Sequence, residues 1–181
     1  MAAITSGEIL FKYSVVAAAG NTTASAAGTS LGDQISTTAW AGSVANDLFD
    51  DISGAENAAS TVDYRCIFVH NSNASNTLEN AVVYLSAETA GGASIAIATD
   101  NIASSAIGSG SAQAAAIGAE TTAPSGTSAF SSPTTLGTGL SLGNIAAGSC
   151  KAFWIRRTAA NTAALSSDGV TIAVGGDTGS L

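Results

Sequence analysis

The sequence has few charged side chains. Its 181 residues include five Lys and Arg and 13 Asp and Glu, so charged residues make up 10% of the chain. A typical soluble domain carries about 25%. Short neutral side chains, chiefly Ala, Gly, Ser and Thr, fill most of the remaining positions. Because these side chains lose little rotamer entropy when a surface is covered, the composition favours a subunit of an assembly over a free enzyme.

Basic residues are especially scarce, and the formal net charge at pH 7 is −8. Contacts with a phosphate backbone require clustered Lys and Arg, so we expect no nucleic-acid partner. The chain also lacks a run of about 18 apolar residues, which excludes a membrane-spanning helix, and we expect no membrane partner. No basic segment precedes an apolar stretch near the start, so we expect no signal peptide and a reducing cytoplasm during folding.

The residues that usually carry catalysis are almost absent, since the chain has one His and two Cys. We find no nucleophile, base or metal set, and we expect neither an enzyme nor a cofactor. A disulfide between Cys66 and Cys150 across the fold is conceivable, but a reducing compartment favours two free, buried thiols. His70 ends a predicted strand without an acidic neighbour, so a solvated or backbone-bonded imidazole is favoured over a general base.

Apolar residues mark several strands. Residues 8–16 alternate between apolar and polar side chains, and residues 64–70 and 81–85 carry large apolar residues on both faces. The Asn- and Ser-rich link between the last two predicts either a hairpin or a crossing between two sheets. Further strands are expected at residues 93–99, 140–142, 150–157 and 170–174, with an exposed tail after them. The pattern predicts an all-β antiparallel β-sandwich, immunoglobulin-like or jelly-roll.

Two long segments have few large residues. Residues 17–45 predict an extended arm, in which Trp40 either anchors a partner or packs on its own sandwich, the latter being favoured. Residues 101–138 are a low-complexity stretch of Ser, Ala and Gly and predict a long loop, with a short helix possible from residue 113 to 119. We therefore expect a strand and arm over residues 1–47 and a sandwich over residues 48–181.

The acidic and basic residues of the chain suggest contact sites. Asp50 and Asp51 lie in an acidic segment with Asp47 and Glu56, whose spacing does not match a calcium loop, so we favour solvated carboxylates and expect no metal. Three of the five basic residues lie in two predicted strands: Arg65, Arg156 and Arg157. They would dock the Asp50–Asp51 segment of another copy, or form an intramolecular pair with Asp63 or Asp168.

Three short motifs suggest a family. They are Leu-Phe-Asp-Asp-Ile-Ser at residues 48–53, Tyr-Arg-Cys-Ile-Phe-Val-His-Asn at residues 64–71 and Phe-Trp-Ile-Arg-Arg at residues 153–157. Together they resemble small virion structural proteins of tailed bacteriophages, over about residues 48–174. The resemblance implies a β-sandwich component of the head or tail and brings no catalytic residues.

The expected function is that of a capsid decoration or cement protein, which stabilises a phage shell through many weak contacts. Its partners would be the major capsid protein or other virion subunits, and it would form a homo-oligomer, with a trimer as one form. We expect it in the virion after assembly in the host cytoplasm. The alternatives are a tail or baseplate component and a host-surface glycan-binding module, for which Trp40 would be the aromatic contact.

Overall fold

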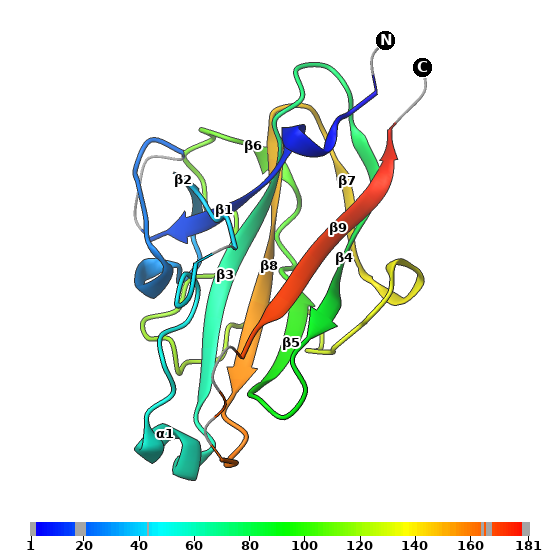
Figure 1. Cartoon of the computed structure of the whole chain (residues 1–181). Coiled ribbons are helices and arrows are strands. Elements are labelled where there is room, and N and C mark those ends of the chain that lie inside the picture. Colours follow the sequence, from blue (N-terminus) through cyan, green and yellow to red (C-terminus); the bar gives the residue numbers. More distant parts are fainter. Residues whose placement is uncertain (1–2, 17–20, 43, 164, 166–167, 179–181) are drawn as a thin grey trace.

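The computed structural model describes residues 3–16, 21–42, 44–163, 165 and 168–178. Two antiparallel sheets pack face to face (Figure 1). The larger, six-stranded sheet contains β1 (Ile9–Val15), β2 (Gln34–Ala39), β3 (Val62–Asn71), β5 (Ser94–Thr99), β6 (Ser105–Ala106) and β8 (Ser149–Thr158). The smaller sheet contains β4 (Leu78–Glu88), β7 (Leu140–Ile145) and β9 (Val170–Thr178). The all-β sandwich predicted from the sequence is confirmed.

The strand order is β2-β1-β3-β8-β5 in the larger sheet, where β6 also pairs with β8, and β7-β4-β9 in the smaller. The link between β3 and β4 therefore crosses from one sheet to the other, and the two do not form a hairpin. Asn71 fixes this crossing, because its amide nitrogen donates to the carbonyls of Asn76 and Ile145 at 2.8 and 2.9 Å. The Asn-rich composition thus serves side-chain-to-backbone bonds in a tight turn.

Both faces of β3 and β8 are buried, which explains their continuous apolar sequences. Ile67 and Phe153 point into the main core between the two sheets. Phe68 and Trp154 point to the outer face of the larger sheet and belong to a second apolar cluster. Each of these four side chains has an exposed fraction of 0%. The second cluster requires a cover from outside the sandwich, because a sheet face this apolar is not stable in water.

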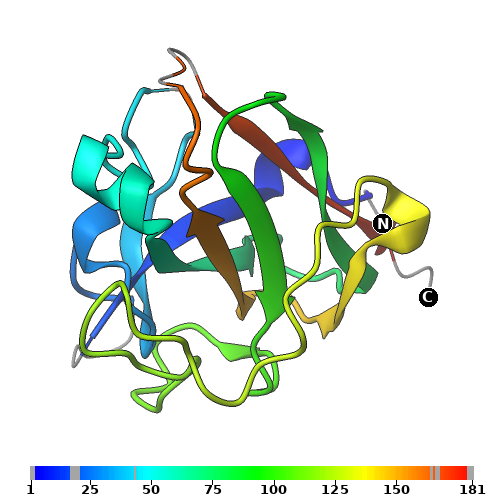
Figure 2. The same ribbon diagram turned by 90° about the horizontal axis from the view of Figure 1, so that it is seen from below.

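Residues 101–138, the segment after β5, provide that cover, and we call this segment the covering layer. It runs along one side of the larger sheet, on the opposite side of the molecule from β9 (Figure 2). Ala114 and Ile117 from this segment are buried in the second cluster. Residues 113–119 form no helix, and the regular pieces of the predicted loop are β6 and the 3-10 turn η3 (Leu136–Thr138). A sequence of low complexity therefore folds here as an ordered layer.

Gln113 attaches this layer to the sheet. Its amide nitrogen donates to Ser105 Oγ at 2.9 Å and to the Ala106 carbonyl at 3.1 Å, and its amide oxygen accepts from the Ile35 N–H at 3.1 Å. We expect Gln113→Ala to lower the free energy of unfolding by about 1–3 kcal/mol, because it leaves a buried backbone N–H without an acceptor. Urea unfolding measures this change. The exposed Thr134→Ala in the same segment is the control, and equal stability of both variants would contradict the role of Gln113.

The structure corrects the expected arm. β2 pairs with β1 inside the larger sheet, with Ser14 opposite Ile35, and the Ile35 side chain is fully buried. Residues 21–23 lie along the outer edge of β2, where Asn21 N–H donates to the Ile35 carbonyl and Thr37 N–H to the Thr23 carbonyl, both at 2.9 Å. Residues 17–20 of the arm lie outside the described residues. β1 and β2 share one sheet with β3, so residues 1–47 are not a separate layer.

One further element was not predicted, and one strand is longer than expected. A short helix, α1 (Gly54–Ala59), follows the acidic segment and begins with a capping box, in which Ser53 Oγ accepts from Glu56 N–H at 3.2 Å. The Ser-x-x-Glu spacing is the sequence signal for it. β9 continues through Gly175 and Gly176 instead of ending there. A Cβ on Gly175 would lie 2.3 Å from Leu136 Cδ1, so this glycine permits close packing and does not end the strand.

Candidate binding pocket

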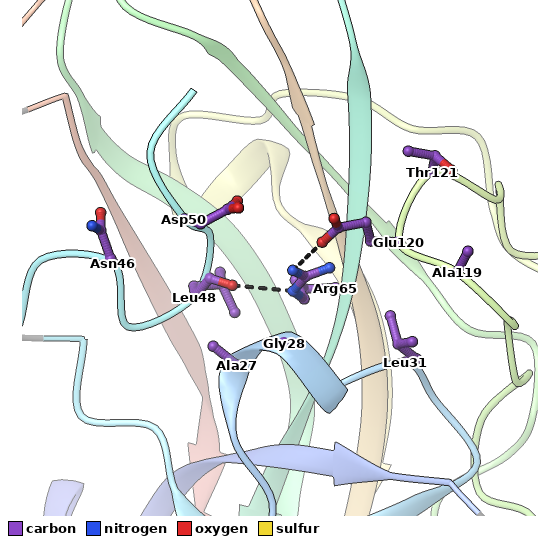
Figure 3. Close-up of a pocket in the computed structure, with 10 residues that line it drawn as sticks. All are labelled: Ala27, Gly28, Leu31, Asn46, Leu48, Asp50, Arg65, Ala119, Glu120 and Thr121. Carbon is purple, nitrogen blue, oxygen red and sulfur yellow. Dashed lines mark hydrogen bonds and ion pairs between the residues drawn. The ribbon is translucent and has the colours of Figure 1, made fainter. Parts of the chain in front are cut away.

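A surface pocket of about 560 Å³ opens beside β3 and the acidic segment (Figure 3). Arg65 forms its floor, and Asp50, Glu120 and Asn46 contribute polar atoms to its walls. Leu31 and Leu48 supply part of the apolar lining. The pocket therefore joins β3, the acidic segment and the covering layer, which are distant in the sequence.

The Arg65 guanidinium is bonded within the protein on every nitrogen. Its Nε donates to the Leu48 carbonyl at 3.2 Å, its Nη1 to the Tyr64 carbonyl at 3.1 Å, and its Nη2 to the Glu120 carboxylate. The Arg65 side chain is 3% exposed, while that of Glu120 is 38% exposed. A ligand in the pocket would thus meet an already neutralised guanidinium and accessible carboxylate oxygens.

Arg157 lies next to this pocket and binds two carboxylates of its own chain. Its Nη2 donates to Asp63 Oδ2 at 2.7 Å and to Asp50 Oδ1 at 3.1 Å. The Asp63 side chain is 6% exposed and that of Asp50 68% exposed. The structure thus supports the intramolecular alternative with Asp63, whereas Asp168 accepts a backbone bond from Ala93 at 2.6 Å. Because the Arg157 guanidinium already binds Asp63 and Asp50 of its own chain, it does not dock the acidic segment of another copy.

Phe49 links the two arginines. The Cζ atoms of Arg65 and Arg157 lie 5.4 and 4.7 Å from the centroid of its ring, within the range of cation–π contacts. Leu48, the residue before it, is buried in the main core. The acidic segment is therefore an anchored wall of the pocket. The expected carboxylate in water fits Asp51, which is exposed, whereas the Asp50 carboxylate, although exposed, pairs with Arg157.

The remaining predicted site residues lie elsewhere. Arg156 stacks over Phe130, with its Cζ 5.2 Å from the ring centroid, on the outer face of the larger sheet. Trp40 packs edge to face against Phe11 at a centroid distance of 5.7 Å and contacts the main core. This confirms self-packing for Trp40. The structure brings Asp50, Arg65 and Arg157 together and separates Arg156 and Trp40 from them.

Positive charge is almost absent from the surface. Four of the five basic residues are buried: Lys12, Arg65, Lys151 and Arg157. Lys151 Nζ, for example, donates to the Asp100 carbonyl at 2.6 Å. Of the 13 acidic residues, Asp63 and Asp100 are buried and the others reach the surface at least in part. The exterior is therefore more acidic than the net charge of the chain indicates, which the sequence alone does not show.

His70 lies in β3 and is buried, with 6% of its surface exposed. It lies opposite Cys150 on β8 and Leu10 on β1. Neither ring nitrogen has a hydrogen-bond partner in the described part of the chain, so the expected solvated or backbone-bonded imidazole is wrong. Burial, aided by the nearby Lys12 ammonium, lowers the pKa of His70 to about 4. Burial also raises the pKa of the free Cys150 thiol to about 12, so both groups are neutral at pH 7.

This histidine predicts a loss of stability in acid. The unfolded chain binds a proton at His70 below about pH 6.5, whereas the folded chain does so only below a pKa of about 4. Stability from this group is complete above pH 6.5 and falls as the pH drops to about 4, by about 3 kcal/mol in total. Urea unfolding at pH 7 and pH 4.5 measures the decrease in the free energy of unfolding. The His70→Leu variant has no imidazole to titrate and responds to pH through its carboxylates alone, so its decrease should be smaller. Equal falls in both proteins would contradict this account.

No group of three or more His, Cys, Asp or Glu side chains in the described ranges is arranged to hold a metal ion. Within the same residues, no helix is long and apolar enough to cross a bilayer. We compared the chain with family models, curated proteins and solved structures. None matches it significantly. The function must therefore be argued from the fold, the pocket and the surface charge.

Proposed function

We propose that this protein is a structural component of a tailed-phage virion, and specifically a capsid decoration protein present in many copies. The observation that carries the proposal is the exterior: small neutral side chains with almost exclusively acidic charges among them. The large apolar side chains described as exposed are few and far apart in the sequence: Val16, Val44, Leu136 and Leu165. Such a surface makes weak contacts at little entropic cost, and many copies on one shell add them up by avidity.

The pocket provides a contact of defined chemistry for this role. Asp50 and Glu120 present carboxylate oxygens around apolar walls, and the Arg65 floor is already neutralised. A Lys or Arg side chain of the major capsid protein fits this arrangement, with its aliphatic stem on the apolar wall and its charge between the carboxylates. Self-association, including a trimer, belongs to the same proposal and is tested by sedimentation equilibrium.

The experiment uses shells of the encoding phage that were assembled without this protein. Purified protein is added, and the bound copies are counted by quantitative gel analysis and located in a particle map. We expect saturable binding that weakens with salt, and we expect Asp50→Lys to reduce the affinity about tenfold by placing a positive charge opposite the basic side chain. Thr134→Lys adds a positive charge at an exposed position outside the pocket and should leave the affinity unchanged.

Each other outcome has a clear meaning. Density on the tail or baseplate would favour the tail alternative, and absence from shells and particles would reject a virion role. Equal weakening by both Lys variants would indicate a general charge effect and remove the pocket from the proposal. The glycan-binding alternative has less support, because the Trp40 ring packs against Phe11 instead of forming an open platform.

A further inference from the structure

The two edges of the larger sheet are covered by the chain itself. Residues 21–23 bond to the backbone of β2. On the other side, Ser131 exchanges two backbone hydrogen bonds with Ile97 of β5, at 2.8 and 3.0 Å. Such covers prevent an edge strand from pairing with other chains.

β9 lacks a cover of this kind. Its ladder partner among the described residues is β4 alone, and the other edge of its nine residues has no backbone pairing. From Val170 to Gly176 it carries no charge and no proline, which are the usual protections of an exposed edge. β7, the opposite edge of the smaller sheet, is short and is interrupted at Gly143, whose φ is 72° and where the register with β4 shifts. The ladder of β9 with β4 also shifts register, between Glu79 and Val82 and between Leu85 and Ala87 of β4, but with nine residues β9 is the longer edge of the smaller sheet.

Apolar side chains beside β9 are only partly covered. β1 and β2 extend past β9 in the larger sheet (Figure 1), so the core face of these strands continues where the smaller sheet ends. Between β9 and the N-terminal segment lies a cavity of about 170 Å³ lined by Ile4, Ile9, Leu78 and Val174. Phe11, Trp40 and Ile172 are also only partly buried against the main core. We call this strip between β9 and β1 the β9 seam.

We propose that the β9 seam binds an extended segment of another protein chain, which joins the smaller sheet as a fourth strand. The main chain of the segment would satisfy the free N–H and C=O groups of β9, and alternate side chains would cover the seam. Glu79 and Asp177 lie opposite each other at the end of β9 and favour a segment with an uncharged centre and a basic end. The inference goes beyond the virion role and does not depend on it.

A second copy of the folded protein does not fit the seam. Two β9 strands paired antiparallel would be related by a two-fold axis perpendicular to the sheet. Both larger sheets would then lie on the same side of the pair, and the β1 and β2 strands of the two copies would compete for the same space. A single extended segment has no such obstruction, which identifies the partner as a flexible arm or tail.

The test ligates a synthetic strand, Lys-Thr-Val-Thr-Val-Thr-Lys, to the C-terminus through a short Gly-Ser linker. Three versions of the strand are made. One is unmodified, one carries N-methyl groups on the odd-numbered residues and one carries them on the even-numbered residues. Because alternate N–H groups point to the same edge of a strand, each methylated version can no longer donate hydrogen bonds from one of its two edges. Hydrogen exchange of the β9 amides and the melting temperature are the readouts. We expect the unmodified strand and one methylated version to slow exchange of the free-edge amides of β9 about tenfold or more and to raise the melting temperature.

The second methylated version should behave like the protein with the linker alone, because the edge it needs is blocked. Equal effects of both methylated versions would mean that the strand does not add to an edge and would overturn the proposal. Unchanged exchange of β9 with the unmodified strand would overturn it as well, since the linker supplies a high local concentration. Neither result bears on shell binding, so failure of this inference is distinguishable from failure of the virion role.

Discussion

Replacing Asp63 by Ala is expected to lower the free energy of unfolding by about 3–5 kcal/mol, because it leaves the buried charge of Arg157 without its principal partner. The Asp63 carboxylate accepts bonds from both Nε and Nη2 of Arg157, at 3.2 and 2.7 Å. Both side chains are less than a tenth exposed, so water cannot replace the lost carboxylate. Chemical denaturation at pH 7 measures the change.

Asp50→Ala is the matched control, since Asp50 binds the same Arg157 nitrogen from a side chain that is 68% exposed. Its removal should change the stability by about 0–1 kcal/mol, as for other exposed ion pairs. The Asp50 carbonyl, which also accepts from Arg157, stays in place in this variant. If Asp50→Ala were as destabilising as Asp63→Ala, burial would not be the property that decides the strength of this pair.

Deleting residues 17–45 is expected to abolish cooperative unfolding altogether. The deletion would remove β2 and the buried Ile35 from the larger sheet and uncover the second apolar cluster. It would also remove Ser30, whose hydroxyl donates to the Cys66 carbonyl of β3 and whose own carbonyl accepts from the Cys66 N–H at 2.9 Å. Differential scanning calorimetry and near-UV circular dichroism should show no thermal transition and no fixed tertiary signal.

Point variants test whether the loss of stability comes from the buried residues of this segment and not from any change within it. Ile35→Ala should cost about 2–5 kcal/mol, as is usual for a fully buried aliphatic side chain. Val44→Ala, at a side chain that is 68% exposed, should be neutral within about 0.5 kcal/mol. A deletion variant that melts cooperatively near the wild-type temperature would show that the segment is an independent arm after all.

The sequence predicts the strands with large apolar residues well. β3 and β8 are apolar on both faces and β1 alternates, so their own residues reveal their environment. β2 escapes prediction because Ile35 is its single large apolar residue, and its burial depends on Gln113 and Ile117, which lie far along the chain. Local patterns carry no information on such distant partners.

The pocket could be predicted only in part. Arg65, Arg157 and Asp50 attract attention because charges are so rare in this chain, and the structure does bring them together. Glu120, which pairs with Arg65, lies in a stretch of Ala, Gly and Thr that gives no sign of its position. Nor does the sequence show that Arg65 and Arg157 form their hydrogen bonds within the protein, since this depends on which acidic residues the topology places beside them.

The covering layer also determines the order in which the fold can be completed. Ile35 and Gln113 are joined by a hydrogen bond yet lie 78 residues apart, and Trp154, which shares a cluster with Ile35, follows later still. A nascent chain on the ribosome therefore exposes the apolar residues of β2 and β3 until β8 has emerged from the exit tunnel. Contacts between such distant residues slow the search for the native state. We expect refolding in vitro to be slow and nascent chains to depend on chaperones, since their outer face is the last to close.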